Sequence, residues 1–69
     1  MVLVFKTSVQ HKKQVKQLKP LLDHSLKPAV WNFDLEDCDK IFRVEASSNI
    51  SHDVIRLLNK EGFSCEELI

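Results

Sequence analysis

The stretch that decides the fold runs from residue 29 to residue 46 and reads AVWNFDLEDCDKIFRVEA. Apolar and polar side chains alternate through Ala29–Leu35 and again through Lys40–Ala46, which is typical of strands that bury one face. The acidic segment Glu36–Asp39 lies between them and has the composition of a turn. The sequence therefore predicts a β-hairpin at this point of the chain.

A helix with clear end signals is expected after the hairpin. Ser51 is the predicted N-cap, and Asp53 places a negative charge in the first turn, where it favours the helix dipole. Gly62 is predicted to stop the helix, because glycine readily adopts the left-handed backbone conformation found there. Phe63–Leu68 is then predicted to be the last strand.

The part before the hairpin repeats the order of strand and helix. Val2–Thr7 is short, β-branched and aromatic, and is predicted to be a strand. Gln10–His24 has apolar residues at helical spacing and is predicted to be a helix. Pro20 lies inside it, and because proline lacks a backbone N–H we expect the helix to kink or to end early there.

These elements predict one domain, residues 1–69, of the α+β class. The expected fold is a ferredoxin-like βαββαβ sandwich, in which a four-stranded antiparallel sheet carries two helices on one face. The predicted core consists of the inward-facing apolar residues Leu3, Phe5, Val15, Leu18, Leu22, Phe33, Val44, Ile55, Leu58 and Phe63.

The charges are unevenly distributed, although the formal net charge is zero. Residues 1–28 hold six lysines against one acid, and residues 29–69 hold nine acids against four basic residues. The first half contains no arginine and a single aromatic residue, so we expect no nucleic-acid binding. The predicted first helix carries Lys12, Lys13, Lys16 and Lys19. These lysines are interpreted either as a docking surface for an acidic protein partner or as an ordinary solvated helix face.

Neither a membrane segment nor a disulfide scaffold is expected. No apolar run approaches the ~20 residues that cross a bilayer, and no signal peptide precedes the first strand, so a cytoplasmic location is expected. Cys38 and Cys65 are too few for a disulfide framework, and the predicted strand order places them at opposite sheet edges.

The chain resembles the heavy-metal-associated domain family, which includes copper chaperones and the amino-terminal domains of copper-transporting ATPases. The resemblance extends over nearly the whole chain and rests on the order and spacing of Phe5-Lys6-Thr7, of Val15, Leu18 and Leu22, of Asp34-Leu35, Asp39-Lys40-Ile41 and Val44-Glu45, and of Glu61-Gly62-Phe63. It implies the same βαββαβ fold and a metal site at the first strand-to-helix junction.

That family binds soft cations such as Cu(I) through a Cys-x-x-Cys motif. Aligned on Leu18 and Leu22, the two family cysteines correspond to His11 and Gln14 of this chain, and the preceding methionine corresponds to Val9. The segment therefore contains no thiolate, and His11 is the one transition-metal ligand left in it.

Two functions remain open from the sequence. The first is a non-enzymatic binding or adaptor domain without a cofactor, which has lost its thiolate metal site and recognises a protein. The alternative is residual transition-metal binding or trafficking through His11, alone or across a dimer. No nucleophile, base and acid are arranged as a catalytic site requires, so an enzyme is not expected. The sequence leaves the partner and the oligomeric state undetermined.

Overall fold

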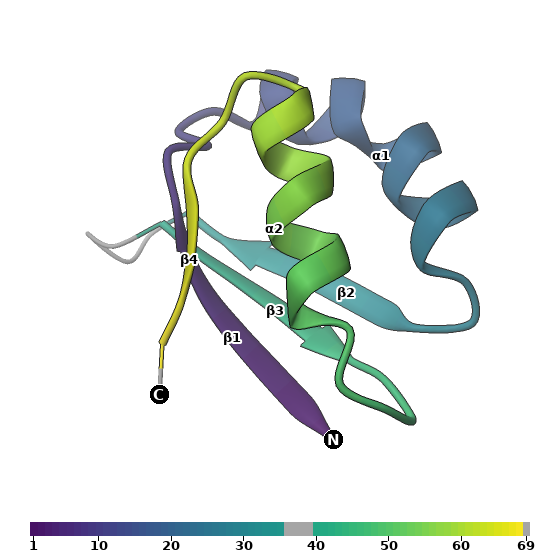
Figure 1. Ribbon diagram of the computed structural model, residues 1–69. Coiled ribbons are helices and arrows are strands. Elements are labelled where there is room, and N and C mark those ends of the chain that lie inside the picture. The colour runs from purple at the N-terminus through teal and green to yellow at the C-terminus, as the bar shows by residue number, and fades with distance from the viewer. Residues whose placement is uncertain (36–39, 69) are drawn as a thin grey trace.

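The computed structural model describes residues 1–35 and 40–68. The elements follow in the order β1 (Val2–Thr7), α1 (Lys12–Leu26), β2 (Val30–Asp34), β3 (Ile41–Glu45), α2 (Ser51–Lys60) and β4 (Cys65–Glu67). The strands form one antiparallel sheet in the order β2-β3-β1-β4, and both helices lie on the same face of it (Figure 1). The predicted α+β ferredoxin-like fold is confirmed.

The core lies between the sheet and the helices. In the sheet register Leu3 pairs with Val44, and Phe5 and Phe33 both pair with Phe42, so these side chains share the helix-covered face. Six of the predicted core residues are buried: Leu3, Phe5, Leu18, Leu22, Val44 and Leu58. The other four, Val15, Phe33, Ile55 and Phe63, are partly buried against this core. Val9, Leu26, Phe42 and Val54 are buried members that the prediction left out.

Helix α1 does not end at Pro20, and it runs two residues beyond the predicted end at His24. Leu18, Leu22 and Leu26 recur every four residues along it and are all buried. Burying each such side chain contributes ~1.5–3 kcal/mol, which offsets the one backbone hydrogen bond that a proline removes. Tertiary packing therefore overrides the local helix-breaking signal.

Helix α2 differs from the prediction at its start and agrees with it at its end. It begins at Ser51, so the N-cap position belongs to Ile50, and the side-chain oxygen of Asn49 accepts a hydrogen bond from the Ser51 N–H (2.9 Å). At the other end Gly62 has a φ of 91°, as predicted for the residue that stops the helix.

A Schellman motif completes the end of α2 and shortens the last strand. The N–H of Gly62 donates to the Asn59 carbonyl (3.1 Å), and the N–H of Phe63 donates to the Leu58 carbonyl (2.9 Å). Ser64 then donates its N–H to the side-chain oxygen of Ser8 (2.9 Å). Residues 63 and 64 are thus engaged outside the sheet, and β4 covers Cys65–Glu67 instead of the predicted Phe63–Leu68.

Neither of the two helices found in residues 1–35 and 40–68 is long and apolar enough to cross a membrane.

Candidate functional site

The first strand-to-helix junction brings His11 and Gln14 to the amino terminus of α1. His11 is the N-cap residue and is exposed, and Gln14 occupies the third helical position. The Gln14 Oε1 atom accepts hydrogen bonds from the backbone N–H groups of Gln10 (2.8 Å) and His11 (3.1 Å). Gln14 is therefore a capping residue, because its amide oxygen satisfies backbone donors that the helix leaves unpaired.

The other metal-capable side chains are scattered over the domain. His24 is exposed in the last turn of α1, and His52 is exposed near the start of α2. Among the described residues, no three His, Cys, Asp or Glu side chains lie close enough to hold a metal ion together. Cys38 and its acidic neighbours lie outside the described residues.

The Cys65 thiol is half-buried on β4. Burial raises its pKa from 9.0 to about 11, because the thiolate loses hydration that the thiol needs less. At neutral pH this group is therefore a protonated thiol with little nucleophilic or metal-binding character.

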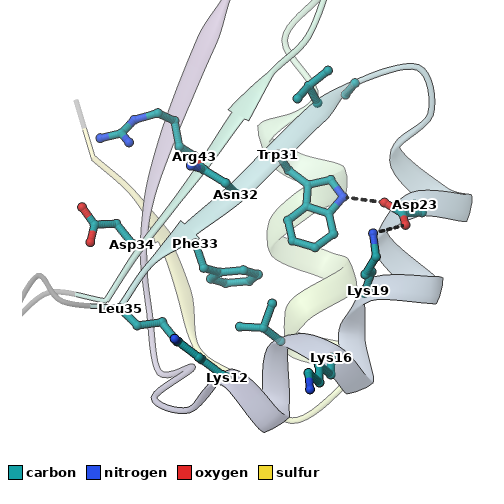
Figure 2. Close-up of a pocket in the computed structure, with 13 residues that line it drawn as sticks. Lys12, Lys16, Lys19, Asp23, Trp31, Asn32, Phe33, Asp34, Leu35 and Arg43 are labelled. Carbon is teal, nitrogen blue, oxygen red and sulfur yellow. Dashed lines mark hydrogen bonds and ion pairs between the residues drawn. The ribbon is translucent and has the colours of Figure 1, made fainter.

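An open groove with a volume of about 850 Å³ lies between α1 and β2. Trp31 and Phe33 project from β2 into the space beneath α1 (Figure 2). Val15 of α1 also lines this groove. The volume is within the range of small-ligand sites, and an apolar floor with a few polar groups is their usual composition.

Three of the four predicted lysines border this groove. Lys12, Lys16 and Lys19 line it, and their spacing of four and three residues places them on one side of α1 (Figure 2). Lys13 is also exposed on α1, but it does not line the groove. The predicted lysine surface thus divides into three groove residues and one residue beside the groove.

One polar cluster fixes α1 against β2. The Trp31 Nε1–H donates to Asp23 Oδ1 (3.1 Å), and the Lys19 ammonium donates to Asp23 Oδ2 (3.1 Å). The Lys19 Nζ also lies 5.9 Å from the centre of the Trp31 ring, a cation–π distance. The Lys19 hydrogen bond, with smaller contributions from Trp31, lowers the pKa of Asp23 below its ordinary value. Asp23 thus remains an anion that orients both the cation and the indole.

Trp31 and Phe33 form the aromatic floor of the groove, and this floor continues into the core. Phe33 stacks on Phe42 with 4.3 Å between ring centres, and Trp31 meets the edge of Phe33 at 5.7 Å. Phe42 is fully buried, whereas Phe33 and Trp31 are only partly buried. Trp31 and Phe33 therefore pack against the buried core on one side and remain partly accessible on the other.

The sequence indicated the lysines of this site but not its floor. Alternation placed Trp31 and Phe33 on the helix-covered face, and that prediction holds. Alternation does not reveal whether a helix covers an edge strand completely, and here α1 leaves part of both rings uncovered. The one signal available was the presence of two large aromatic residues on a strand at a sheet edge.

Comparisons with protein-family models, with curated proteins and with solved structures found no match to this chain.

Proposed function

We propose that this chain is a small, non-enzymatic adaptor domain that binds an acidic protein through the groove between α1 and β2. The observation that carries the proposal is the row of Lys12, Lys16 and Lys19 above the aromatic floor of Trp31 and Phe33. Interfaces gain affinity from buried aromatic anchors and gain specificity from charges around them. This groove offers both kinds of contact.

The charge of the groove supports an anionic partner. On the helix side, three lysines face one carboxylate, Asp23, which already binds Lys19. Within the described part of the chain, Lys16 forms no ion pair. The net charge of the whole chain is zero, so the excess of positive charge along the groove is local. This local excess attracts an acidic segment, but it does not make the whole domain a binder of polyanions in general.

The proposal includes descent from a heavy-metal-associated domain that has lost its thiolate site. The residues at the two motif positions support the loss, since His11 is an exposed N-cap and the Gln14 oxygen is occupied by two backbone donors. Residual metal binding through His11 would have to use a single imidazole, whereas stable sites use several ligands. We therefore rank it below the adaptor function and expect no resident cofactor.

A protein partner also fits the placement of the aromatic residues better than a nucleic acid does. Domains of this topology that bind single-stranded RNA stack bases on aromatic side chains of the open sheet face. Here Phe5, Trp31, Phe33 and Phe42 all occupy the helix-covered face. We propose a cytoplasmic protein as the partner.

The test uses hexaglutamate as the probe and the fluorescence of Trp31, the only tryptophan of the chain, as the readout. Binding in the groove should change this fluorescence and should weaken as salt is added. Lys16→Glu should weaken binding roughly three- to tenfold, since an exposed pair contributes ~0.2–1 kcal/mol and reversal adds repulsion.

Lys13→Glu is the matched control, because it makes the same charge change on the same helix outside the groove. It should retain an affinity within about twofold of the parent, since only screened, longer-range attraction is lost. Absence of binding, or an equal loss in both variants, would reject the groove as the binding site.

A further inference from the structure

Strand β2 has a free outer edge. The sheet order β2-β3-β1-β4 places it at one side, with no further strand beyond it among the described residues (Figure 1). An edge strand presents unpaired backbone groups on which another strand can add.

The hydrogen bonds of β3 determine which residues of β2 carry the unpaired backbone groups. At the two ends of the β1–β3 pair, Thr7 donates its N–H to the Lys40 carbonyl (3.2 Å) and Ala46 donates to the Met1 carbonyl (2.9 Å). The even-numbered residues of β3 therefore point their backbone groups at β1. Its odd-numbered residues, Ile41, Arg43 and Glu45, must point at β2.

Those odd residues pair with Asp34, Asn32 and Val30 of β2. Because the direction of the backbone groups alternates along a strand, the N–H and C=O groups of Trp31 and Phe33 point to the free edge. No partner for these four groups is found within the described residues. The two residues that form the groove floor with their side chains thus also carry the free backbone groups.

Each outward-facing residue on either side already has one backbone group engaged. Ala29 donates its N–H to the Leu26 carbonyl (2.7 Å), and the Leu35 carbonyl accepts from the Lys40 ammonium (3.0 Å). Among the described residues of this edge, Trp31 and Phe33 are therefore the two outward-facing ones with both backbone groups unpaired. A strand added there would lie directly beside the groove and beneath the lysines of α1.

The spacing of the lysines matches such a strand. Four helical residues rise ~6.0 Å, so Lys12 and Lys16 are separated along α1 by nearly the ~6.8 Å between alternate residues of an antiparallel strand. Lys19 lies over Trp31, and Lys12 lines the groove together with Leu35, so α1 runs antiparallel to β2 across it.

We propose that the groove takes an extended acidic peptide of a partner protein, which adds to β2 as an antiparallel fifth strand. Its backbone pairs with Trp31 and Phe33, and glutamates at alternate positions lay their methylene groups over the two rings and their carboxylates beside the lysines. This binding mode rests on the proposed function. A second copy of the chain is a poorer occupant, because β2-to-β2 pairing would set the α1 lysines of the two copies against each other.

The test compares three eight-residue peptides of alternating threonine and glutamate. The first is unmodified, the second is N-methylated at each glutamate, and the third is N-methylated at each threonine. In an antiparallel pair, peptide residues opposite Trp31 and Phe33 share their side-chain direction and point their N–H groups at β2. Those residues are the glutamates. Affinity is read from Trp31 fluorescence.

The unmodified and the threonine-methylated peptides should bind within about threefold of each other, since the methyl groups of the latter face solvent. Methylation at glutamate should weaken binding roughly tenfold or more, because two backbone hydrogen bonds are lost. Equal affinity of all three peptides would overturn strand addition and leave hexaglutamate binding, and so the proposed function, intact. Peptide-independent dimerisation through β2, detected by sedimentation, would also overturn it.

Discussion

Introducing two cysteines at the amino terminus of α1 should create a Cu(I) site. The double substitution His11→Cys with Gln14→Cys places thiols at the N-cap and at the third helical position. A helix amino terminus lowers the pKa of a thiol, and Cu(I) prefers thiolate ligands. The proposed loss of an ancestral site predicts that the remaining geometry still supports binding.

The cost of the change follows from the capping contacts. Gln14→Cys removes the acceptor of two exposed backbone N–H groups, at 2.8 and 3.1 Å. Loss of a helix cap costs ~0.5–2 kcal/mol, and the exposure of these groups to water favours the lower half of that range. A domain of this size loses ~4–8 °C in Tm per kcal/mol, so the metal-free variant should melt roughly 2–10 °C below the parent.

Cu(I) should reverse this loss. A ligand at 100 times its Kd stabilises the folded state by ~2.7 kcal/mol, which exceeds the capping cost and should raise the Tm above that of the parent. The assay is thermal unfolding under reducing conditions with and without Cu(I), in a Cys38→Ser background that removes a competing thiol. Equal stabilisation of the parent would refute the lost site, and no stabilisation of the variant would refute the proposed ancestry.

Three further outcomes follow from the packing and the titrating groups. Phe42→Ala should lower the free energy of unfolding by ~3–5 kcal/mol and Phe33→Ala by about half as much, since Phe42 is fully buried and Phe33 is not. Chemical unfolding measures both losses, and equal losses would contradict the difference in burial. Burial raises the Cys65 pKa from 9.0 to about 11, so the folded state retains a proton that the unfolded chain releases, and stability should fall between those pH values by an amount that Cys65→Ala removes. The pKa of Asp23 is lowered by its hydrogen bond to Lys19, so Trp31 fluorescence should titrate below pH 3.8 in the parent and not in Asp23→Asn.

Much of the fold could be predicted because its signals are local. The alternation through residues 29–46 sets the faces of β2 and β3, which the structure bounds one residue inside the prediction at each end. Gly62 ends α2 as expected, because few residues other than glycine tolerate its φ of 91°. The strand order follows from topology rules that hold for most βαβ-type connections.

The rest depends on contacts that no local pattern contains. Helix α1 continues past Pro20 because Leu22 and Leu26 pack into the core, whose other residues come from distant parts of the sequence. The hydrogen bond between Trp31 and Asp23 joins β2 to α1, and these two elements are brought together only when the chain folds. The division of the lysines is different, since helical periodicity alone could have separated Lys13 from the other three.

Two ¹H–¹⁵N spectra of the labelled domain distinguish protein recognition in the groove from metal binding at His11, one recorded with hexaglutamate and one with equimolar Cu(I) under reducing conditions. We expect hexaglutamate to move the backbone signals of Lys16, Lys19 and Phe33 and the indole signal of Trp31, and Cu(I) to leave the signals of Ser8–His11 unmoved. Movement of Ser8–His11 by Cu(I), with no response of the groove to hexaglutamate, would contradict the adaptor function and favour metal binding through His11.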